Sequence, residues 1–234
     1  GAHASGAVRA ELCAEAIHLT TLLTERASTA TPATHALLAL MCLTAARLPA
    51  RRDVDGTLLA LGEQDRTRWD RELIARGRAA LAQAALDPSR ASYEDGLSTY
   101  HFEAEIAQLH AEAASRAHTR WTDIVAIYEA LLRFAPSPVI ALNRAIAIGE
   151  ALGPERALEE LRALESDARL ATYPFLPAAT GDVLERLGRR PEARDAFLRA
   201  ASLARSDEER AFFRARAAAC DVNGSRSEAS GRRR

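Results

Sequence analysis

Lysine is absent from the 234-residue sequence, and each of the 31 basic side chains other than histidine is an arginine. We attribute this to base-composition bias in a GC-rich genome. The 32 acidic side chains nearly balance the arginines and leave a formal net charge of −1. Such a balance argues against a nucleic-acid-binding surface spread over the whole chain, so we expect no direct contact with nucleic acid.

Aromatic residues are scarce as well, at 5% of the chain, although hydrophobic residues make up 48%. That hydrophobic content is ample for a packed core in a chain of this length. Alanine, leucine, arginine and glutamate are abundant and are strong helix formers, whereas β-branched residues are few. The composition therefore predicts an all-α protein.

Cysteine is limited to Cys13, Cys42 and Cys220, which are odd in number, far apart and without a CxxC pair. This usage is typical of reduced cysteines in a cytosolic protein. No apolar run approaches the roughly 18 residues of a membrane span, and no signal peptide is evident. We therefore expect a cytoplasmic protein with no membrane segment.

Motifs for catalysis and nucleotide binding are missing, since the sequence contains no GxSxG, Walker or GxGxxG pattern. The densest cluster of possible metal ligands consists of His101, His110, His118, Glu103, Glu105 and Glu112. Its histidines are nine and eight residues apart, whereas a helical zinc site such as HExxH places two histidines four apart. We favour capping or solvent-exposed roles for them, and we expect no enzyme activity, metal or cofactor.

The second half of the chain contains an internal repeat with a period of 36 residues. Residues Ala145, Ile148, Ala157, Leu161 and Leu164 correspond to Gly181, Leu184, Ala193, Phe197 and Ala200. Each copy has a small residue three positions before a larger apolar one, then a turn and a second helix. A weaker copy lies 36 residues earlier. Residues 100–219 are therefore predicted to form an α-solenoid of tetratricopeptide-like helical hairpins, whose usual period is about 34, with a C-terminal capping helix.

Residues 8–99 are predicted to form an N-terminal helical section. Its expected helices span about 8–26, 32–47 and 64–86, and the second should be central because it is apolar on more than one side. Residues 51–63 form an irregular connector with a turn at Asp55 and Gly56. A polar loop is expected at 89–98, a tag or linker at 1–7 and a disordered basic tail at 220–234.

Two short strings have predicted structural roles. In the first, Asp65, Arg66 and Asp70 flank Trp69. Arg66 and Asp70 are four residues apart, so they can pair on a helix surface and lock the connector to the helix. In the second, Pro136 and Pro138 open the string PSPVIALNRAIAI, around which the repeats are arranged.

Candidate binding residues lie beside the predicted buried line of the central repeat. Asn143 and Arg144 are on a helix expected to line the inner face of the superhelix, where they could clamp the backbone or a carboxylate of a partner. The alternative, which we favour, is that they bond to the neighbouring repeat. Tyr100 and His101 are the other candidates, near a groove that could hold a small molecule.

Three strings carry a resemblance to a known family: GTLLALGEQDRTRWDRELIARG (56–77), HAEAASRAHTRWTDIVAIYEALLRFAPSPVIALNRAIAI (110–148) and VLERLGRRPEARDAFLRAASLA. They resemble the C-terminal tetratricopeptide-like extension of extracytoplasmic-function (ECF) type sigma factors of bacterial RNA polymerase. The similarity spans about residues 9–219. Within it, STYHFEAEIAQ (98–108) departs from the family's usual GPYQLQAAIAA, because charged Glu103 and Glu105 replace neutral residues.

The resemblance implies a non-catalytic domain that regulates a sigma factor. It would contact its own sigma-factor regions, RNA polymerase or a separate signalling protein. Nothing before Arg9 resembles the regions that bind polymerase and read promoters, so this chain alone is not expected to initiate transcription. Two alternatives from other classes remain: a free-standing tetratricopeptide-like adaptor, and a small-molecule sensor or enzyme.

Overall fold

The structure is a computed structural model that describes residues 2–85 and 97–231. Within these ranges it contains ten α-helices joined by turns and short 3₁₀ helices, and no β-strand. The predicted all-α fold is therefore confirmed. The chain divides into two compact units, Gly1–Arg120 and Trp121–Arg234.

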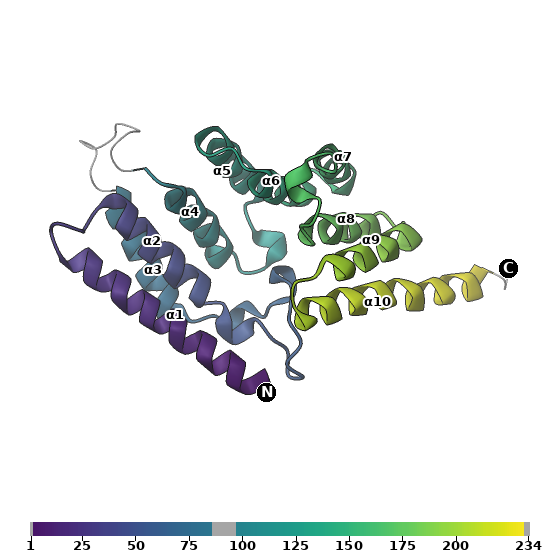
Figure 1. Cartoon of the computed structure of the whole chain (residues 1–234), viewed down its shortest axis with the longest axis horizontal. Coiled ribbons are helices and arrows are strands. Elements are labelled where there is room, and N and C mark those ends of the chain that lie inside the picture. The colour runs from purple at the N-terminus through teal and green to yellow at the C-terminus, as the bar shows by residue number, and fades with distance from the viewer. Residues whose placement is uncertain (1, 86–96, 232–234) are drawn as a thin grey trace. The chain divides into compact units, whose positions relative to one another are not determined.

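The first unit is built around one central helix, as the sequence predicted. Its α-helices are α1 (Ala2–Glu25), α2 (Pro32–Ala45), α3 (Arg71–Ala85) and α4 (Thr99–Glu112). Helix α2 packs against the other three (Figure 1). It begins with Pro32 in its first turn, after Thr31, whose Oγ1 accepts a hydrogen bond from the Thr34 amide at 3.2 Å. Its buried residues are Ala36, Leu38, Ala39, Cys42, Leu43 and Ala45.

The segment Pro32–Ala50 is long and apolar enough to cross a membrane by the criteria of length and composition. It has 19 residues and a mean hydropathy of 1.3, so the prediction that no apolar run approaches this length was wrong. Its apolar side chains are used on several sides within the first unit, since three helices pack against α2. A helix in a protein core also has apolar residues on several sides, so it meets the same criteria of length and composition.

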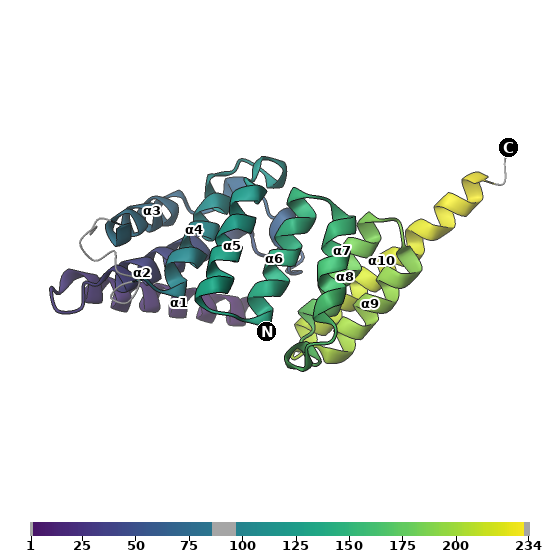
Figure 2. The ribbon, with the colours of Figure 1, turned by 90° about the horizontal axis from the view of Figure 1, so that it is seen from above.

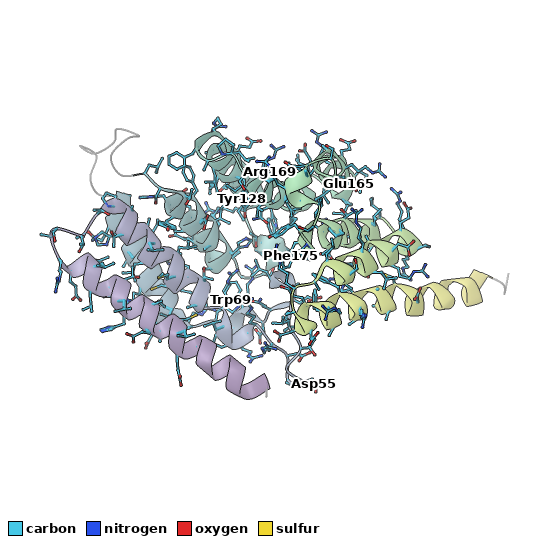
Figure 3. The ribbon with its side chains drawn as sticks, viewed as in Figure 1. Asp55, Trp69, Tyr128, Glu165, Arg169 and Phe175 are labelled. Carbon is cyan, nitrogen blue, oxygen red and sulfur yellow. The ribbon has the colours of Figure 1, made fainter. Side chains whose placement is uncertain are left out.

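The connector between α2 and α3 is irregular, as predicted, and contains three 3₁₀ turns: η1 (Leu48–Ala50), η2 (Leu61–Glu63) and η3 (Arg66–Arg68). At its tip, Asp53 Oδ1 accepts hydrogen bonds from the amides of Asp55 and Thr57, at 3.0 and 2.8 Å. Gly56 has a φ of 83°, a conformation that favours glycine. Asp55, labelled in Figure 3, therefore marks a turn closed by the connector's own side chains.

The second unit is a row of helical hairpins. Its helices are α5 (Trp121–Phe134), α6 (Pro138–Ala151), α7 (Pro154–Leu164), α8 (Phe175–Arg186), α9 (Arg190–Leu203) and α10 (Asp207–Gly231). Each helix packs against the next along the chain (Figure 2). Nearest-neighbour packing of this kind is the defining feature of an α-solenoid.

Small residues mark the closest approach of consecutive helices in the second unit. A Cβ atom added to Gly181 on α8 would lie 2.8 Å from a ring carbon of Phe197 on α9. One added to Gly149 on α6 would lie 2.9 Å from the Cβ of Ala157 on α7. The small residue at Gly181, one position of the 36-residue repeat, is therefore explained by the close approach of α8 and α9. The last helix closes the row by burying Phe213 and Ala217.

Several boundaries differ from the predicted ones. Helix α4, expected to open the first repeat, packs against α2 and α3, so the first unit extends to Arg120 instead of ending at 99. Helix α1 begins at Ala2, within the predicted linker. Helix α10 continues to Gly231 through most of the predicted tail, where no proline interrupts it. Most of the polar loop predicted at 89–98 lies outside the described residues.

Candidate functional site

A groove of about 810 Å³ runs along one face of α2 in the first unit. Its floor consists of side chains three or four positions apart, which share a face of a helix: Leu37, Leu40, Met41, Thr44 and Leu48. Helix α1 contributes one wall through Cys13, Ala16 and Ile17. The sequence placed a groove near Tyr100 instead, and only the surplus of apolar residues on α2 hinted at this one.

Polar groups gather beyond the C-terminal end of α2, where the connector borders the groove. The Leu59 amide donates to the carbonyl of Arg51 at 3.0 Å, and Gln64 Nε2 donates to the carbonyl of Leu59 at 3.4 Å. These contacts hold Arg51 and Gln64 together, and Arg47 lines the same groove one helical turn before Arg51. Gln64 Oε1 is buried and receives no hydrogen bond from the described residues. This end therefore combines two cations with an unsatisfied acceptor.

A single carboxylate lines the groove elsewhere. Glu103 belongs to α4, and its neighbour Ala104 packs in the cluster that contains Leu38 and Cys42. The charge of Arg47 acts on His110, two turns after Glu103 on the same helix, so Glu103 lies about 10 Å back along α4 from that contact. Desolvation by the surrounding protein raises the pKa of the Glu103 carboxyl. The groove is thus apolar along its floor, cationic at one end and acidic toward the other.

Arg66 ties the connector to the end of α4. Its Nη1 donates to the carbonyls of His110 and Ala113, at 2.9 and 2.7 Å, and its Nη2 donates to Thr119 Oγ1 at 3.2 Å. The guanidinium also lies over the ring of Trp69, 5.2 Å from its centroid. Trp69, labelled in Figure 3, is only 3% exposed. One arginine thus supplies donors for carbonyls at a helix end, which otherwise lack partners.

The two aspartates of the same string act as local caps. Asp65 Oδ1 accepts from the amide and the hydroxyl of Thr67, at 2.9 and 2.6 Å, and these hydrogen bonds lower the pKa of Asp65. Asp70 Oδ1 accepts from the amides of Glu72 and Leu73 and so starts α3. The expected Arg66 to Asp70 pair is not among the interactions of the described residues. Arg66 bonds to carbonyls near α4 instead.

The histidines occupy capping and core positions. The Ser98 amide donates to His101 Nδ1 at 3.1 Å at the start of α4, and Ser115 Oγ bonds to His118 Nδ1 at 2.8 Å with the same three-residue spacing. His110 is buried, and its pKa is lowered to about 4 by desolvation and by the charges of Arg47 and Arg66. In the described part of the chain, no three His, Cys, Asp or Glu side chains are grouped to hold a metal ion.

The other predicted binding residues do not gather in one unit. Tyr100 and His101 belong to the first unit, whereas Asn143 and Arg144 belong to the second. Arg144 Nη2 pairs with Glu160 Oε2 on α7 at 2.8 Å. Asn143 is exposed beside it on α6. Pro138 is the first residue of α6, and Pro136 lies in the turn before it.

Arginines also connect alternate helices of the second unit. Arg186 on α8 pairs with Glu150 on α6 at 2.7 Å and donates to the carbonyl of Gly149 at 2.8 Å. Arg216 on α10 pairs with Asp182 and Glu185 on α8, at 2.6 and 2.8 Å. These contacts link α6 to α8 and α8 to α10. Because Arg186 and Arg216 are already paired within the unit, they are less available to a carboxylate of a partner. The groove on α2 is therefore the stronger candidate site.

Comparison with known proteins places the groove in a recognised sequence region. Residues 1–85 match the model of a family of unknown function, DUF6596. This region contains every residue that lines the groove except Glu103. An uncharacterized protein of Rhizobium meliloti (strain 1021) is 40% identical over 207 residues, which are 88% of this chain and 47% of the relative. The chain therefore spans about half the length of the curated relative it matches. No solved structure matches it.

Proposed function

We propose that the chain is a non-catalytic protein-interaction domain that regulates an ECF-type sigma factor in the bacterial cytoplasm. One observation carries the interaction role: a stripe of exposed leucines on α1. Leu12, Leu19, Leu22 and Leu23 are 64, 53, 42 and 44% exposed. Exposed apolar side chains that lie next to one another mark protein interaction sites more often than isolated ones do.

The stripe is separate from the side of α1 that packs in the core. Leu12, Leu19 and Leu23 follow a spacing of seven and four residues, which aligns them on a helix. Ile17 is buried, and Thr20 Oγ1 contacts the sulfur of Met41 on α2 at 3.3 Å. Helix α1 thus has one apolar side in the core and a second in solvent. A partner helix with matching apolar residues would bind the second side.

The sigma-factor part of the proposal is supported by sequence. The string QDRTRWD, on which the resemblance depends, builds the Arg66 contacts that join the connector to α4. The relative from R. meliloti is about twice as long as the matched region, so it has room for further domains. We propose that the exposed leucines contact helical sigma-factor regions of the same polypeptide or of RNA polymerase.

The proposal is tested by replacing Leu12, Leu19 and Leu23 with glutamine in the chromosomal gene. Exposed substitutions of this kind change stability little, about 0.5 kcal/mol or less each. We expect transcript levels of a defined set of promoters to change, measured by RNA sequencing and by transcription with purified polymerase. A matched control replaces Ile146, Leu152 and Leu198, which are 41, 65 and 47% exposed in the second unit. The control should leave the transcripts unchanged.

Two results would contradict the proposal. The first is unchanged transcription by a leucine triple variant whose helicity and melting temperature match the wild type. The second is a partner that copurifies through the α1 stripe and has no part in transcription, which would favour the adaptor alternative.

A further inference from the structure

We propose that the groove on α2 holds one amphipathic α-helix of the partner protein, with an acidic residue in the first turn of that helix and a basic residue about two turns later. The inference rests on the interaction role proposed above, and it adds the position and the charges of the partner helix.

The groove has the dimensions of a trough for a single helix. Leu37 and Leu48 mark the ends of its floor and are eleven positions apart, which corresponds to roughly 16 Å, or about three helical turns. An α-helix with its side chains is about 10–12 Å across, so one half of a helix of that length occupies roughly 600–900 Å³. The groove's volume of about 810 Å³ falls within this range. A helix lying half inside the groove would therefore fill it and leave its other side in solvent.

The lining suits the apolar side of an amphipathic helix. Helices α1 and α2 lie side by side (Figure 1), so a floor from α2 meets a wall from α1. Leu40 and Met41 on the floor are apolar, and methionine adapts its shape to the surface that it meets. On the wall, Cys13 and Ala16 are small and leave space for the side chains of a third helix. Binding of a helix in an apolar groove is a recurrent mode of peptide recognition.

The groove adjoins the leucine stripe of α1. Ala16 lines the groove, and it lies four positions after Leu12 and three before Leu19, on the same side of the helix. The exposed leucines therefore border the groove. A partner helix of the kind proposed for the stripe would bury both apolar surfaces at once, which a small molecule inside the groove would not do.

Two charges without partners give the occupant its polarity. Arg51 lines the groove beside the connector, is exposed, and forms no side-chain ion pair or hydrogen bond with the described residues. Glu103 lines the groove from α4 and likewise pairs with none of the described residues, although desolvation raises the pKa of its carboxyl. A carboxylate of the partner helix would pair with Arg51, and a cation of that helix would pair with Glu103.

The same charges set the direction and the spacing. Glu103 lies about 10 Å back along α4 from His110, the residue on which Arg47 acts, and this distance equals about two helical turns. Acidic side chains stabilise the first turn of a helix and basic ones the last, so a helix that begins beside Arg51 carries each charge where it is favoured. Gln64 at that end fits this direction, because its Oε1 lacks a donor among the described residues and the first N–H groups of a helix lack acceptors.

The test uses the full chain and two helical peptides of about 15 residues. Each has a leucine stripe along one side and a side-chain lactam that holds the helix, since short helices are marginal in water. The first peptide has glutamate in its first turn and arginine two turns later, and the second has these two residues exchanged. We expect fluorescence anisotropy to show saturable binding of the first peptide in the micromolar range, and at least about tenfold weaker binding of the second.

Variants of the chain locate the contacts. Arg51→Glu combined with Glu103→Arg should reverse the preference, so that the exchanged peptide binds more tightly than the first. Thr44 is exposed on the groove floor, so Thr44→Trp fills part of the groove without disturbing the core and should weaken both peptides by about tenfold or more. Arg133→Glu, at an exposed position of the second unit, is the matched control and should bind both peptides as the wild type does.

Three outcomes would overturn the proposal: no saturable binding of the first peptide by the wild type, equal affinity for the two peptides, or a double charge variant that keeps the wild-type preference. The transcription test of Leu12, Leu19 and Leu23 does not involve the charges of the groove. Changed transcription together with equal affinity for both peptides would therefore remove only this inference. Selective peptide binding together with unchanged transcription would instead remove the sigma-factor role and keep the groove as a site for a helix.

Discussion

His110 is a buried imidazole whose charged form is disfavoured in the folded protein, because its pKa falls from 6.5 to about 4. Between these values the unfolded chain binds a proton that the folded chain does not, so stability decreases as the pH falls. We expect the free energy of unfolding to be insensitive to this group above about pH 7. It should fall by up to about 3 kcal/mol as the pH drops to 4, and level off below.

Urea unfolding at pH 7.5, 5.5 and 4.5 measures this contribution. His110→Gln should remove that part of the pH dependence, whereas His18→Gln, at an exposed position of α1, should retain it. An unchanged pH dependence in His110→Gln would assign the acid sensitivity to other groups.

Gly181 tests how closely α8 and α9 approach each other. Gly181→Ala places a methyl group within 3 Å of the Phe197 ring, and overpacking of this kind costs about 1–3 kcal/mol. Alanine gains up to about 1 kcal/mol in helix propensity, so we expect a net loss of up to about 2 kcal/mol, measured by chemical denaturation. Gly181→Ala combined with Phe197→Leu should lose less than the sum of the two changes. A rise in stability for Gly181→Ala alone would mean that the two helices are farther apart.

At the scale of helices and connectors, Arg66 joins the connector to the end of α4. Arg66 donates through Nη1 to two carbonyls and through Nη2 to Thr119 Oγ1, so the single nitrogen of Arg66→Lys cannot reproduce the fork of donors or the stacking on Trp69. We expect a loss of about 1.5–3 kcal/mol in thermal or urea unfolding, the range for hydrogen bonds that involve a charge. Arg68→Lys, at an exposed position two residues away, should cost less than about 0.5 kcal/mol. Equal effects of the two substitutions would contradict the structural role of Arg66.

The elements that the sequence predicted well are those with local signals. The central place of α2 followed from apolar residues on several of its sides, and the second unit's helices followed from the 36-residue repeat. The partners of Arg66 could not be predicted, because they are backbone carbonyls at the end of α4. Every residue has a carbonyl, so the sequence does not indicate which ones an arginine will bind. The groove was missed for a related reason. Its wall on α1 and its Glu103 on α4 are far from α2 in sequence, so only folding brings them together.

At the scale of the whole molecule, each hydrophobic cluster draws its residues from one unit. The clusters around Leu38 and Leu43 contain residues of the first unit, and those around Phe197 and Phe213 contain residues of the second. We therefore expect segments 1–120 and 121–234, expressed separately, each to show a helical circular-dichroism spectrum and a cooperative melting transition. Gly181→Ala should lower the melting temperature of the second segment, which contains this residue, and the first segment should melt as before. A segment that remains unfolded alone would contradict this independence.

One wall of the groove contains a natural cysteine, Cys13, that can be modified chemically. Cys13 is half-buried there, whereas Cys42 and Cys220 are buried and have their pKa values raised by burial. Because the thiolate is the reactive form, disulfide exchange near neutral pH should modify Cys13 first. A library of aliphatic disulfides of increasing length, captured on this thiol and weighed by mass spectrometry, would therefore act as a ruler of the groove's depth.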